Sequence, residues 1–415
     1  MSQSHAQDEP IAPVPRVTIQ AFCETQSVAD SIEAMAADRR MVKAHVRVQT
    51  GGGAAAAAGA GGGAPPHERL LEARSQSPEE FLEQLDRLAE VCDSGTEVIV
   101  LGYVNDVGFY RELVRRGVRD YLIVPAAPID LVRAVSGLYA APGAKPVGRT
   151  IAVIGAKGGV GASTIAHNVA WSFARTLASP TVIVDLDVAY GTAGLDFNQD
   201  PPQGIADIVF APDRVDATIV ERLLSRCADR LSLLAAPAVL DRTCDLTETA
   251  FDHLVDILRA STPTIVLDVP HVWTAWARRL LVGSDDVLVV AAPELASLRN
   301  TKNLVDLLKQ SRPNDHPPKV LLNQVGVPKR PEIAPADFAK ALGLEPAAAI
   351  PFEPQLFGTA ANNGQMIAEI QPNAKVAECF DDIARAIVGR TAERRRSGGS
   401  LLEPFLSKLV RRKAS

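Results

Sequence analysis

An apolar run, a glycine-rich turn and an amphipathic segment follow one another directly, and together they constrain the fold more than any other part of the chain. The run is "TIAVIG", the turn is "AKGGVGA", and the segment is "STIAHNVAWSFARTLA". Short β-branched apolar runs are typical of buried strands, and apolar residues at helical spacing predict a helix that packs on the sheet. This order of elements predicts an α/β protein.

The turn also has the composition of a phosphate-binding loop. Successive N–H groups from Gly158 to Ser163 would line an anion site at the N-terminus of the following helix. Ser163 can offer its hydroxyl to Mg²⁺. Such loops normally carry a lysine before the Ser/Thr, but here Ala162 stands at that place and Lys157 lies five residues earlier. The alternative is an ordinary glycine turn.

The chain of 415 residues is long for one domain, and its pattern divides it into two series. Each series alternates strands with helices, which predicts a mostly parallel sheet with helices on both faces. The run "GGGAAAAAGAGGG" at 51–63 is predicted to be a flexible insertion, because it offers no specific face to bury. The predicted division is a disordered tail at 1–15, a first domain at 16–140, a linker at 141–149, a second domain at 150–390 and a basic tail at 391–415.

The loop sequence "KGGVGAST" resembles the deviant Walker A motif of the MinD/ParA ATPases, usually KGGxGK[ST]. The resemblance implies a P-loop ATPase domain at 150–390 that binds ATP and Mg²⁺ and forms a homodimer across the bound ATP. It implies that Lys157 reaches the partner's phosphates, that Ala162 replaces the loop lysine, and that Ser163 holds Mg²⁺. The nucleotide-binding residues implied are Lys157, Gly158, Gly159, Val160, Gly161, Ala162, Ser163, Thr164, Asn323 and Pro351.

Further segments resemble the same family, in the same order. In "TVIVDLDVAYGTAGLDF" the second aspartate, Asp187, would orient the attacking water, so the implied catalytic residues are Lys157 and Asp187. In "TIVLDVP" Asp268 would lie near the metal and act through water. In "LNQVG" Asn323 would contact adenine, and "IPFEPQLFGTAANNGQ", which contains Pro351, would be the loop that closes over the base.

The exchange at Ala162 has a predictable cost. A lysine on phosphate makes a charge-assisted contact of about 1.5–3 kcal/mol. Its loss should weaken nucleotide affinity by roughly one to two decades. Turnover should suffer more, because charge develops on the γ-phosphoryl oxygens in the transition state. We therefore expect nucleotide binding, weak ATP hydrolysis, and a nucleotide that serves mainly to hold a dimer together.

The first domain resembles a response-regulator receiver, which has a flavodoxin-like fold. A working receiver needs an acidic cluster after its first strand, an Asp after its third and a Lys after its fifth. This chain offers only Glu24, Glu72 and Val124 at those places. Phosphorylation is not expected, and the domain is predicted to be a pseudo-receiver used for binding or localisation. A flavodoxin-like fold of unrelated use stays open.

A pseudo-receiver fused to a MinD-like ATPase resembles the CpaE/TadZ family. Those proteins accompany the secretion machinery of Flp/Tad pili and help to place it at the cell pole. The resemblance implies an ATP-binding, dimerising scaffold whose partners are the secretion ATPase or inner-membrane components of that machinery. The alternatives are an active ParA-type ATPase that partitions DNA or cargo, a division-site regulator like MinD, and a structural protein that has lost nucleotide.

The C-terminal tail bears on location. If "SLLEPFLSKLVRRK" at 400–413 is helical, its apolar residues share one face and its basic residues crowd the other. That pattern suits an anionic membrane surface, and a disordered tail or a helix that docks on a protein are the alternatives. We expect a cytoplasmic protein, peripheral at the inner membrane or cell pole. The net charge of -6 gives no reason to expect a nucleic-acid partner.

Overall fold

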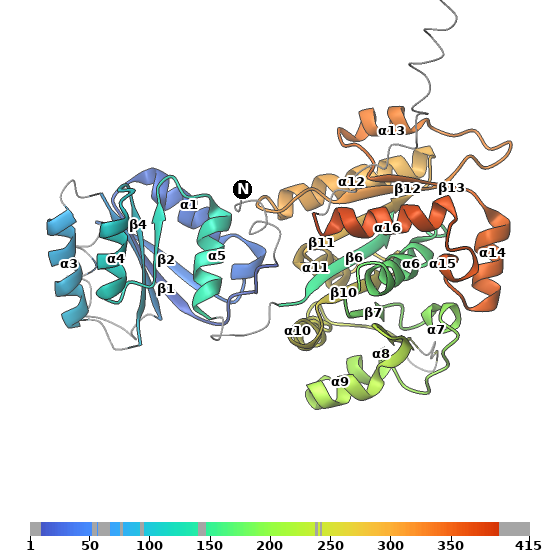
Figure 1. The fold of residues 1–415 in the computed structure, drawn as a ribbon, viewed down its shortest axis with the longest axis horizontal. Helices are drawn as coiled ribbons and strands as arrows, with labels where there is room; N and C mark the ends of the chain where they lie inside the picture. Colours follow the sequence, from blue (N-terminus) through green and yellow to red (C-terminus); the bar gives the residue numbers. More distant parts are fainter. Residues whose placement is uncertain are drawn as a thin grey trace, which may run out of the picture.

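The computed structural model describes residues 10–51, 56, 67–74, 78–91, 95–139, 147–236, 240 and 243–389. Figure 1 shows two α/β lobes side by side, the first in blue and the second in green to red. The glycine-alanine insert apart from residues 51 and 56, the linker segment 141–146 and the whole tail 391–415 lie outside the described residues. The predictions made for them stay predictions.

The first lobe contains one five-stranded sheet in which every neighbouring pair is parallel. The strand order is β2-β1-β3-β4-β5, the flavodoxin-like doubly wound order. Helices α1 and α5 pack on one face and α3 and α4 on the other. The elements are β1 (Thr18–Cys23), α1 (Gln26–Ala36), the 3-10 helix η1 (Arg39–Met41), β2 (His45–Thr50), β3 (Glu68–Ala73), α3 (Pro78–Val91), β4 (Glu97–Gly102), α4 (Val107–Arg115), β5 (Asp120–Ile123) and α5 (Pro128–Leu138).

Residues 10–15 lie in the segment that the sequence predicted to be disordered, yet they pack on this lobe. Val14 is fully buried, and its N–H donates to the carbonyl of Arg40 at 2.9 Å. The Ser136 hydroxyl donates to the carbonyl of Ala12 at 2.8 Å. The segment is therefore tied down by main-chain contacts that composition does not reveal.

Glu72 occupies the end of β3, where a receiver would carry its phosphoacceptor. Its carboxylate is buried and accepts from the N–H groups of Glu24 and Thr25 at 2.7 and 2.8 Å. It also accepts from the hydroxyls of Thr25 and Tyr103 at 2.7 and 2.8 Å. Glu72 is therefore a clamp that joins the loops after β1 and β4.

The second lobe is built on an eight-stranded sheet in the order β13-β12-β11-β6-β10-β7-β9-β8. All neighbours are parallel except the hairpin pair β8 and β9 at one edge. The predicted α/β class with mostly parallel sheets is confirmed. The strands are β6 (Arg149–Gly155), β7 (Thr181–Asp185), β8 (Ser225–Ala228), β9 (Leu231–Leu234), β10 (Thr264–Val269), β11 (Asp286–Ala291), β12 (Lys319–Val325) and β13 (Ala348–Pro351).

Helices cover both faces of this sheet (Figure 1). Helices α10 to α13 contribute to the core on one face, and α6, α15 and α16 to the core on the other. Among the helices of the described residues, none has the length and hydropathy needed to cross a membrane. The helices are α6 (Ala162–Arg175), α7 (Ala193–Asp196), α8 (Ile205–Val209), the 3-10 helix η2 (Pro212–Arg214), α9 (Ala217–Leu223), α10 (Asp252–Ser261), α11 (Ala275–Gly283), α12 (Leu295–Ser311), α13 (Pro335–Leu342), α14 (Pro354–Asn363), α15 (Ile367–Ile370) and α16 (Lys375–Ile387).

A buried group of charges, the seam cluster, joins the two lobes and consists of Arg39, Arg40, Asp285, Arg312 and Asp315. Arg39 Nε lies 2.8 Å from Asp315 Oδ2, and Arg39 Nη2 lies 3.2 Å from Asp285 Oδ1. Arg40 contacts the other oxygen of Asp315. Burial alone would raise the pKa of Asp315, but the hydrogen bond and charge of Arg39 outweigh it, so this pKa lies below its ordinary value.

Candidate nucleotide site

The glycine-rich loop leaves the middle of the sheet, where β6 lies between β10 and β11. Gly159 and Gly161 have left-handed backbones, with φ of 77° and 83°, which favours glycine at both positions. At Gly161 a Cβ would also lie 2.6 Å from Asn323 Nδ2, so the Asn323 amide would have to move. Helix α6 begins at the next residue, Ala162, so the loop turns directly into a helix N-terminus.

Side chains from the loop after β10, from helix α12 and from strand β12 hold the glycine-rich loop in place. The carbonyl of Gly155 lies 2.8 Å from His271 Nδ1, and that of Ala156 accepts from Asn300 Nδ2 at 2.9 Å. Further along, the carbonyl of Val160 accepts from Asn323 Nδ2 at 2.8 Å. The neighbour of Asn323 on β12, Gln324, donates to the carbonyl of Gly159 at 3.0 Å.

Gln324 reaches the loop because β12 is irregular at this point. The β12–β13 register shifts between Leu322 and Val325, and Gln324 has a left-handed backbone with φ of 55°. An irregularity of this kind re-aims side chains, and here two consecutive residues, Asn323 and Gln324, both bond to the loop. The Asn323 amide thus supports the loop, and its predicted contact with adenine stays a prediction.

The amide groups of the loop are free to bind a ligand. Within the described part of the chain, the N–H groups of Gly158, Gly159 and residues 161–164 donate no hydrogen bond. A Cβ built on Gly158 or Gly159 would meet nothing within 4 Å, so the space in front of them is open. Unpaired amides at a helix N-terminus attract anions, so this arrangement fits the phosphates of a nucleotide.

The residues also fit a magnesium ion bound together with those phosphates. The Ser163 hydroxyl makes no hydrogen bond to any described residue, and Asp268 lies at the end of β10, the strand next to β6. Among the described residues, no group of three or more His, Cys, Asp or Glu side chains could hold a metal ion. A bound Mg²⁺ would therefore depend on Ser163 and on phosphate oxygens.

Lys157, predicted to serve the partner's phosphates, pairs within its own chain. Its Nζ lies 2.7 Å from Glu294 Oε1, just before α12. Half of the Lys157 side chain is exposed, so this ion pair faces solvent. Exposed pairs of this kind contribute about 0–1 kcal/mol, which a phosphate group could readily replace.

Asp187 lies two residues after β7, and Asp185 fixes the turn that carries it. Asp185 accepts from the N–H groups of Asp187 and Ala193, each at 3.1 Å. Burial, together with the nearby charge of Asp268, raises the pKa of Asp185 to about 7. At Gly191 a Cβ would lie 2.4 Å from Asp185 Oδ2, so this turn requires glycine. Asp187 itself accepts from the N–H of Tyr190 at 3.0 Å.

A buried histidine lies one helical turn beyond Ser163. His167 Nδ1 is 2.7 Å from Asp196 Oδ2, and His167 Nε2 is 3.4 Å from Asp268 Oδ2. Burial would lower the pKa of His167, but the two carboxylates outweigh it and raise the pKa to about 10. The sequence shows this histidine only as one residue on a mostly apolar helix face.

Pro351 differs from the other predicted residues in its position. It is the last residue of β13, the edge strand three places from β6, and no described hydrogen bond joins it to the glycine-rich loop. The segment predicted to be a loop that closes over the base begins with the end of β13 and continues as helix α14. Its role at adenine stays a prediction.

The structure thus brings the loop residues 157–164, Asn323, Asp187 and Asp268 to one edge of the sheet. Sequence reasoning missed six residues that support these site residues, because all but Asp185 are recognisable only through a contact with a residue far away in the sequence. These are Asp185, His167, His271, Glu294, Asn300 and Gln324.

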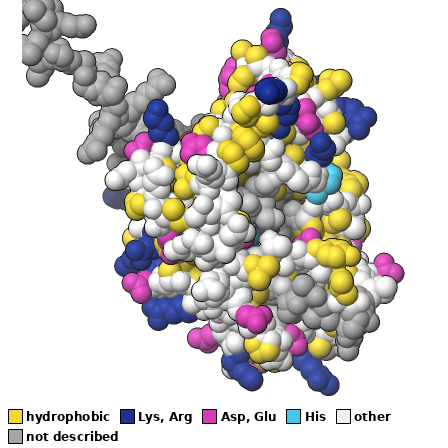
Figure 2. Space-filling view, turned by 90° about the vertical axis from the view of Figure 1, so that its right-hand side faces the viewer, with side chains coloured by type: hydrophobic (Ala, Val, Ile, Leu, Met, Phe, Trp, Pro, Cys, Tyr) yellow, Lys and Arg dark blue, Asp and Glu magenta, His cyan; other side chains and the backbone are white. Residues whose placement is uncertain are grey.

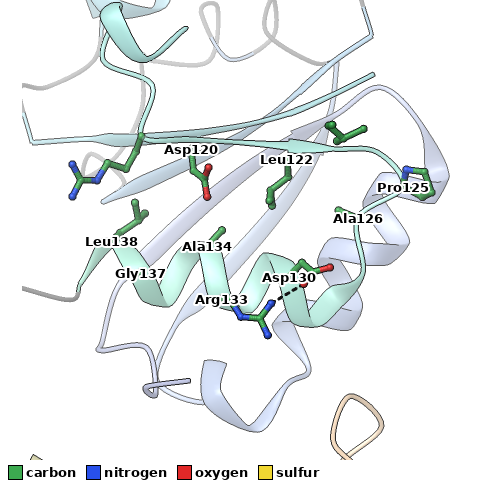
Figure 3. A pocket seen from close by; sticks show the side chains of 11 residues that line it. Asp120, Leu122, Pro125, Ala126, Asp130, Arg133, Ala134, Gly137 and Leu138 are labelled. Carbon is green, nitrogen blue, oxygen red and sulfur yellow. Dashed lines mark hydrogen bonds and ion pairs between the residues drawn. The ribbon is translucent and has the colours of Figure 1, made fainter. Parts of the chain in front are cut away.

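A hollow of about 430 Å³ lies elsewhere, between β5 and α5 of the first lobe (Figure 3). Its polar side chains include Asp130 and Arg133, whose Oδ1 and Nη1 atoms pair at 2.8 Å. Asp120 Oδ1 accepts from the N–H of Tyr121. These polar groups of the hollow already have partners, whereas most amides of the glycine-rich loop have none among the described residues. The glycine-rich loop is therefore the better candidate for a ligand-binding site.

A protein family and several known proteins are similar to this chain. A family described as an AAA domain matches residues 148–317. Septum site-determining protein MinD of Thermotoga maritima is 25% identical over 250 residues, which are 59% of this chain and 89% of the relative. The solved MinD of Pyrococcus horikoshii, complexed with Mg-ADP, is 19% identical with a TM-score of 0.51, covering 58% of this chain and 95% of that one.

The first lobe is similar to a different protein. The solved pilus assembly protein CpaE of Caulobacter crescentus is 43% identical over 32% of this chain and 100% of that one, with a TM-score of 0.30. This likeness falls on the receiver-like region. The AAA-domain match and the MinD relatives thus make this chain similar to the MinD/ParA ATPases, and its receiver-like region is similar in sequence to a CpaE protein.

Proposed function

We propose that this protein binds ATP with Mg²⁺, dimerises across the bound nucleotide and hydrolyses it slowly. The observation that carries the proposal is a loop whose amides are unpaired and open to solvent while Ala162 stands where a lysine would be. Backbone amides give affinity for phosphate without that lysine. The transition state of hydrolysis loses more stabilisation than bound ATP does, because it carries extra negative charge and has one cation fewer nearby.

The surface around the loop supports a second copy as the partner. Large apolar side chains are exposed four or five residues after three strands that end at this edge: Tyr190 after β7, Trp273 after β10 and Leu295 after β11. Figure 2 looks onto the side where α7 and α14 lie, and shows hydrophobic groups among charged ones. Exposed apolar groups around a site that also carries the half-exposed Lys157 suit a dimer interface.

We further propose that the dimer is a scaffold for pilus assembly machinery. The CpaE protein similar to the first lobe is described as a pilus assembly protein. The Glu72 clamp supports a binding role over a phosphorylation switch, because its carboxylate already accepts four hydrogen bonds. Placement at an inner membrane through residues 400–415 belongs to the same proposal.

The second candidate is an active MinD-type or ParA-type ATPase, which the relatives of the second lobe favour. Steady-state turnover separates the two functions. The scaffold predicts a kcat well below the 1–100 s⁻¹ common among phosphoryl-transfer enzymes such as kinases.

The test of dimerisation uses two variants that break the same ion pair from opposite sides. Lys157→Ala removes the proposed trans cation, whereas Glu294→Gln only releases it from its cis partner. Light scattering with Mg²⁺ and ATP should give a monomer for Lys157→Ala and a dimer for Glu294→Gln. A Lys157→Ala protein that dimerises like the wild type would contradict the proposed role of Lys157.

A further inference from the structure

One residue beside the glycine-rich loop has a backbone conformation that its residue type rarely adopts. Gln324 has a φ of 55°, in the left-handed region that is uncommon for residues other than Gly, Asn, Asp and His. Strain of this kind persists only where the surrounding structure holds it, and it is concentrated at functional sites. Gln324 Nε2 donates to the carbonyl of Gly159 at 3.0 Å, so the strained residue contacts the proposed phosphate site directly.

Two charged residues after β12, Arg330 and Glu332, form a clasp that holds Gln324 in this conformation. The Arg330 guanidinium donates to the main-chain carbonyl of Gln324, and its Nη1 lies 3.4 Å from Gln324 Oε1. Glu332 Oε1 pairs with Arg330 Nη2 at 2.8 Å. The same carboxylate accepts from the N–H groups of Gly326 and Val327 at 2.9 and 3.0 Å. Because the oxygen of the Gln324 side chain faces a guanidinium, its NH₂ group is the end that faces the loop.

The side chains of β12 fix the direction of two peptide units in the loop. In a planar trans peptide the C=O and the N–H point in opposite directions. Asn323 Nδ2 holds the carbonyl of Val160 at 2.8 Å, so the N–H of Gly161 points away from Asn323. Gln324 holds the preceding carbonyl, that of Gly159, in the same way. The two peptide units that join the left-handed Gly159 and Gly161 are therefore held from one strand.

This support matters more in a loop that lacks its lysine. Glycine has the greatest backbone freedom of any residue, and ordering it around a ligand costs conformational entropy. With Ala162 in place of a cation, backbone amides carry most of the attraction for phosphate. A loop whose peptide units are already oriented loses less freedom on binding, so its amides give more affinity.

We propose that Gln324 is a positioning residue, which orients the peptide unit between Gly159 and Val160 and so pre-organises the glycine-rich loop for a polyphosphate group. The Arg330–Glu332 clasp acts through Gln324. The inference rests on the proposed function, because it concerns the same loop. It deepens that function by assigning part of the phosphate affinity to a side chain of β12.

The test compares Gln324→Gly and Gln324→Asn with the wild type. Both new residues tolerate a left-handed backbone, but Gly removes the amide and Asn, one CH₂ shorter, withdraws it from Gly159. Ala178→Gly is the matched control, because Ala178 has a φ of 52° and lies exposed just past the other end of α6. Arg330→Lys keeps the charge of the clasp but loses the guanidinium fork. Circular dichroism first shows that each variant is folded.

Calorimetry in Mg²⁺ then measures the binding of two probes, ATP and inorganic tripolyphosphate, which has no base. Because one hydrogen bond to the loop is lost, we expect both Gln324 variants to bind both probes about five- to tenfold more weakly. Ala178→Gly should bind them like the wild type. Arg330→Lys should weaken binding in the wild-type background but cause no further loss in Gln324→Gly, because it acts through the side chain that is missing there.

Gln324 variants that bind tripolyphosphate like the wild type would overturn the proposal. A loss confined to ATP would overturn it as well, because Gln324 would then act on the base. The two probes also separate this inference from the proposed function. If tripolyphosphate binds in a manner that depends on Gln324 while no protein binds ATP, the inference stands and the proposed function fails. If the wild type binds neither probe, both are wrong.

Discussion

Asp315 of the seam cluster provides a prediction whose size follows from the structure. Its carboxylate is only 7% exposed and contacts Arg39, Arg40 and Arg312. The three guanidinium groups are themselves almost completely buried. Removing one partner from a buried ion pair costs about 3–5 kcal/mol, because it leaves charge without compensation. We therefore expect Asp315→Asn to lower the free energy of unfolding by at least about 3 kcal/mol.

The same interface offers a matched control. Lys43 Nζ and Asp256 Oδ2 also join the two lobes, at 3.2 Å, but the Asp256 side chain is 48% exposed. Exposed pairs contribute about 0–1 kcal/mol, so Asp256→Asn should change the unfolding free energy by no more than that. Both variants exchange one interdomain aspartate for an isosteric amide, and only the burial differs.

Denaturant unfolding, followed by circular dichroism and by tryptophan fluorescence, measures both effects. All three tryptophans, Trp171, Trp273 and Trp276, lie in the second lobe, so fluorescence reports on that lobe and circular dichroism on both. If Asp315→Asn loses no more stability than Asp256→Asn, the seam cluster does not hold the lobes together and the reasoning from burial is refuted.

The pH dependence has a definite sign. The folded-state pKa of Asp315 lies below its ordinary value of 3.8. The ionised Asp315 carboxylate therefore adds to the free energy of unfolding above pH 3.8, and this stabilisation is lost as the pH falls below 3.8. The stability difference between the wild type and Asp315→Asn should therefore shrink in acid. A difference that stays constant down to pH 2 would contradict this account.

Three further predictions concern other parts of the molecule. Ala162→Lys should tighten ATP binding by roughly ten- to a hundredfold, because it restores a phosphate contact, and equal affinities by calorimetry would refute that account. Burial raises the pKa of Glu68 from 4.5 to about 7, so the wild type loses stability as pH rises through that window. Glu68→Gln should consequently gain ~1–3 kcal/mol over the wild type at pH 8 but not at pH 4, and a pH-independent difference in denaturant melts would exclude this cause. Deleting residues 400–415 should reduce co-sedimentation with anionic liposomes, and unaltered binding would show that this tail is not the membrane element.

The sequence predicts those parts of the fold whose causes are local. The strand before Gly155 and the helix after Gly161 are read from an apolar run, a glycine turn and helical spacing, and β6 and α6 match them. The edge strand β8, with the half-exposed sequence Ser225–Ala228, has no such signal, since four residues without an apolar run do not stand out. Helix α14 was missed for a related reason, because Pro354 and the glycines around it are typical of a loop.

In the candidate site, too, only the features with local causes could be predicted from the sequence. The backbone cradle could be predicted, since glycine spacing and a helix start determine it. Its supports could not, because Lys157 and Glu294 are 137 residues apart, and Asn323 meets Val160 across 163 residues. Only the folded sheet brings such pairs together. The same holds for His167, whose position on an apolar helix face gives no indication of the two carboxylates that it meets.

The central claim is that the loop, although it lacks its lysine, still couples nucleotide binding to dimerisation. ATP and ADP binding by calorimetry, with molar mass by light scattering on the same samples, tests it most directly. The account predicts that ATP binds with Mg²⁺ and doubles the mass of the 44.1 kDa chain. If neither nucleotide binds, or if ATP binds and the mass does not change, the claim is wrong.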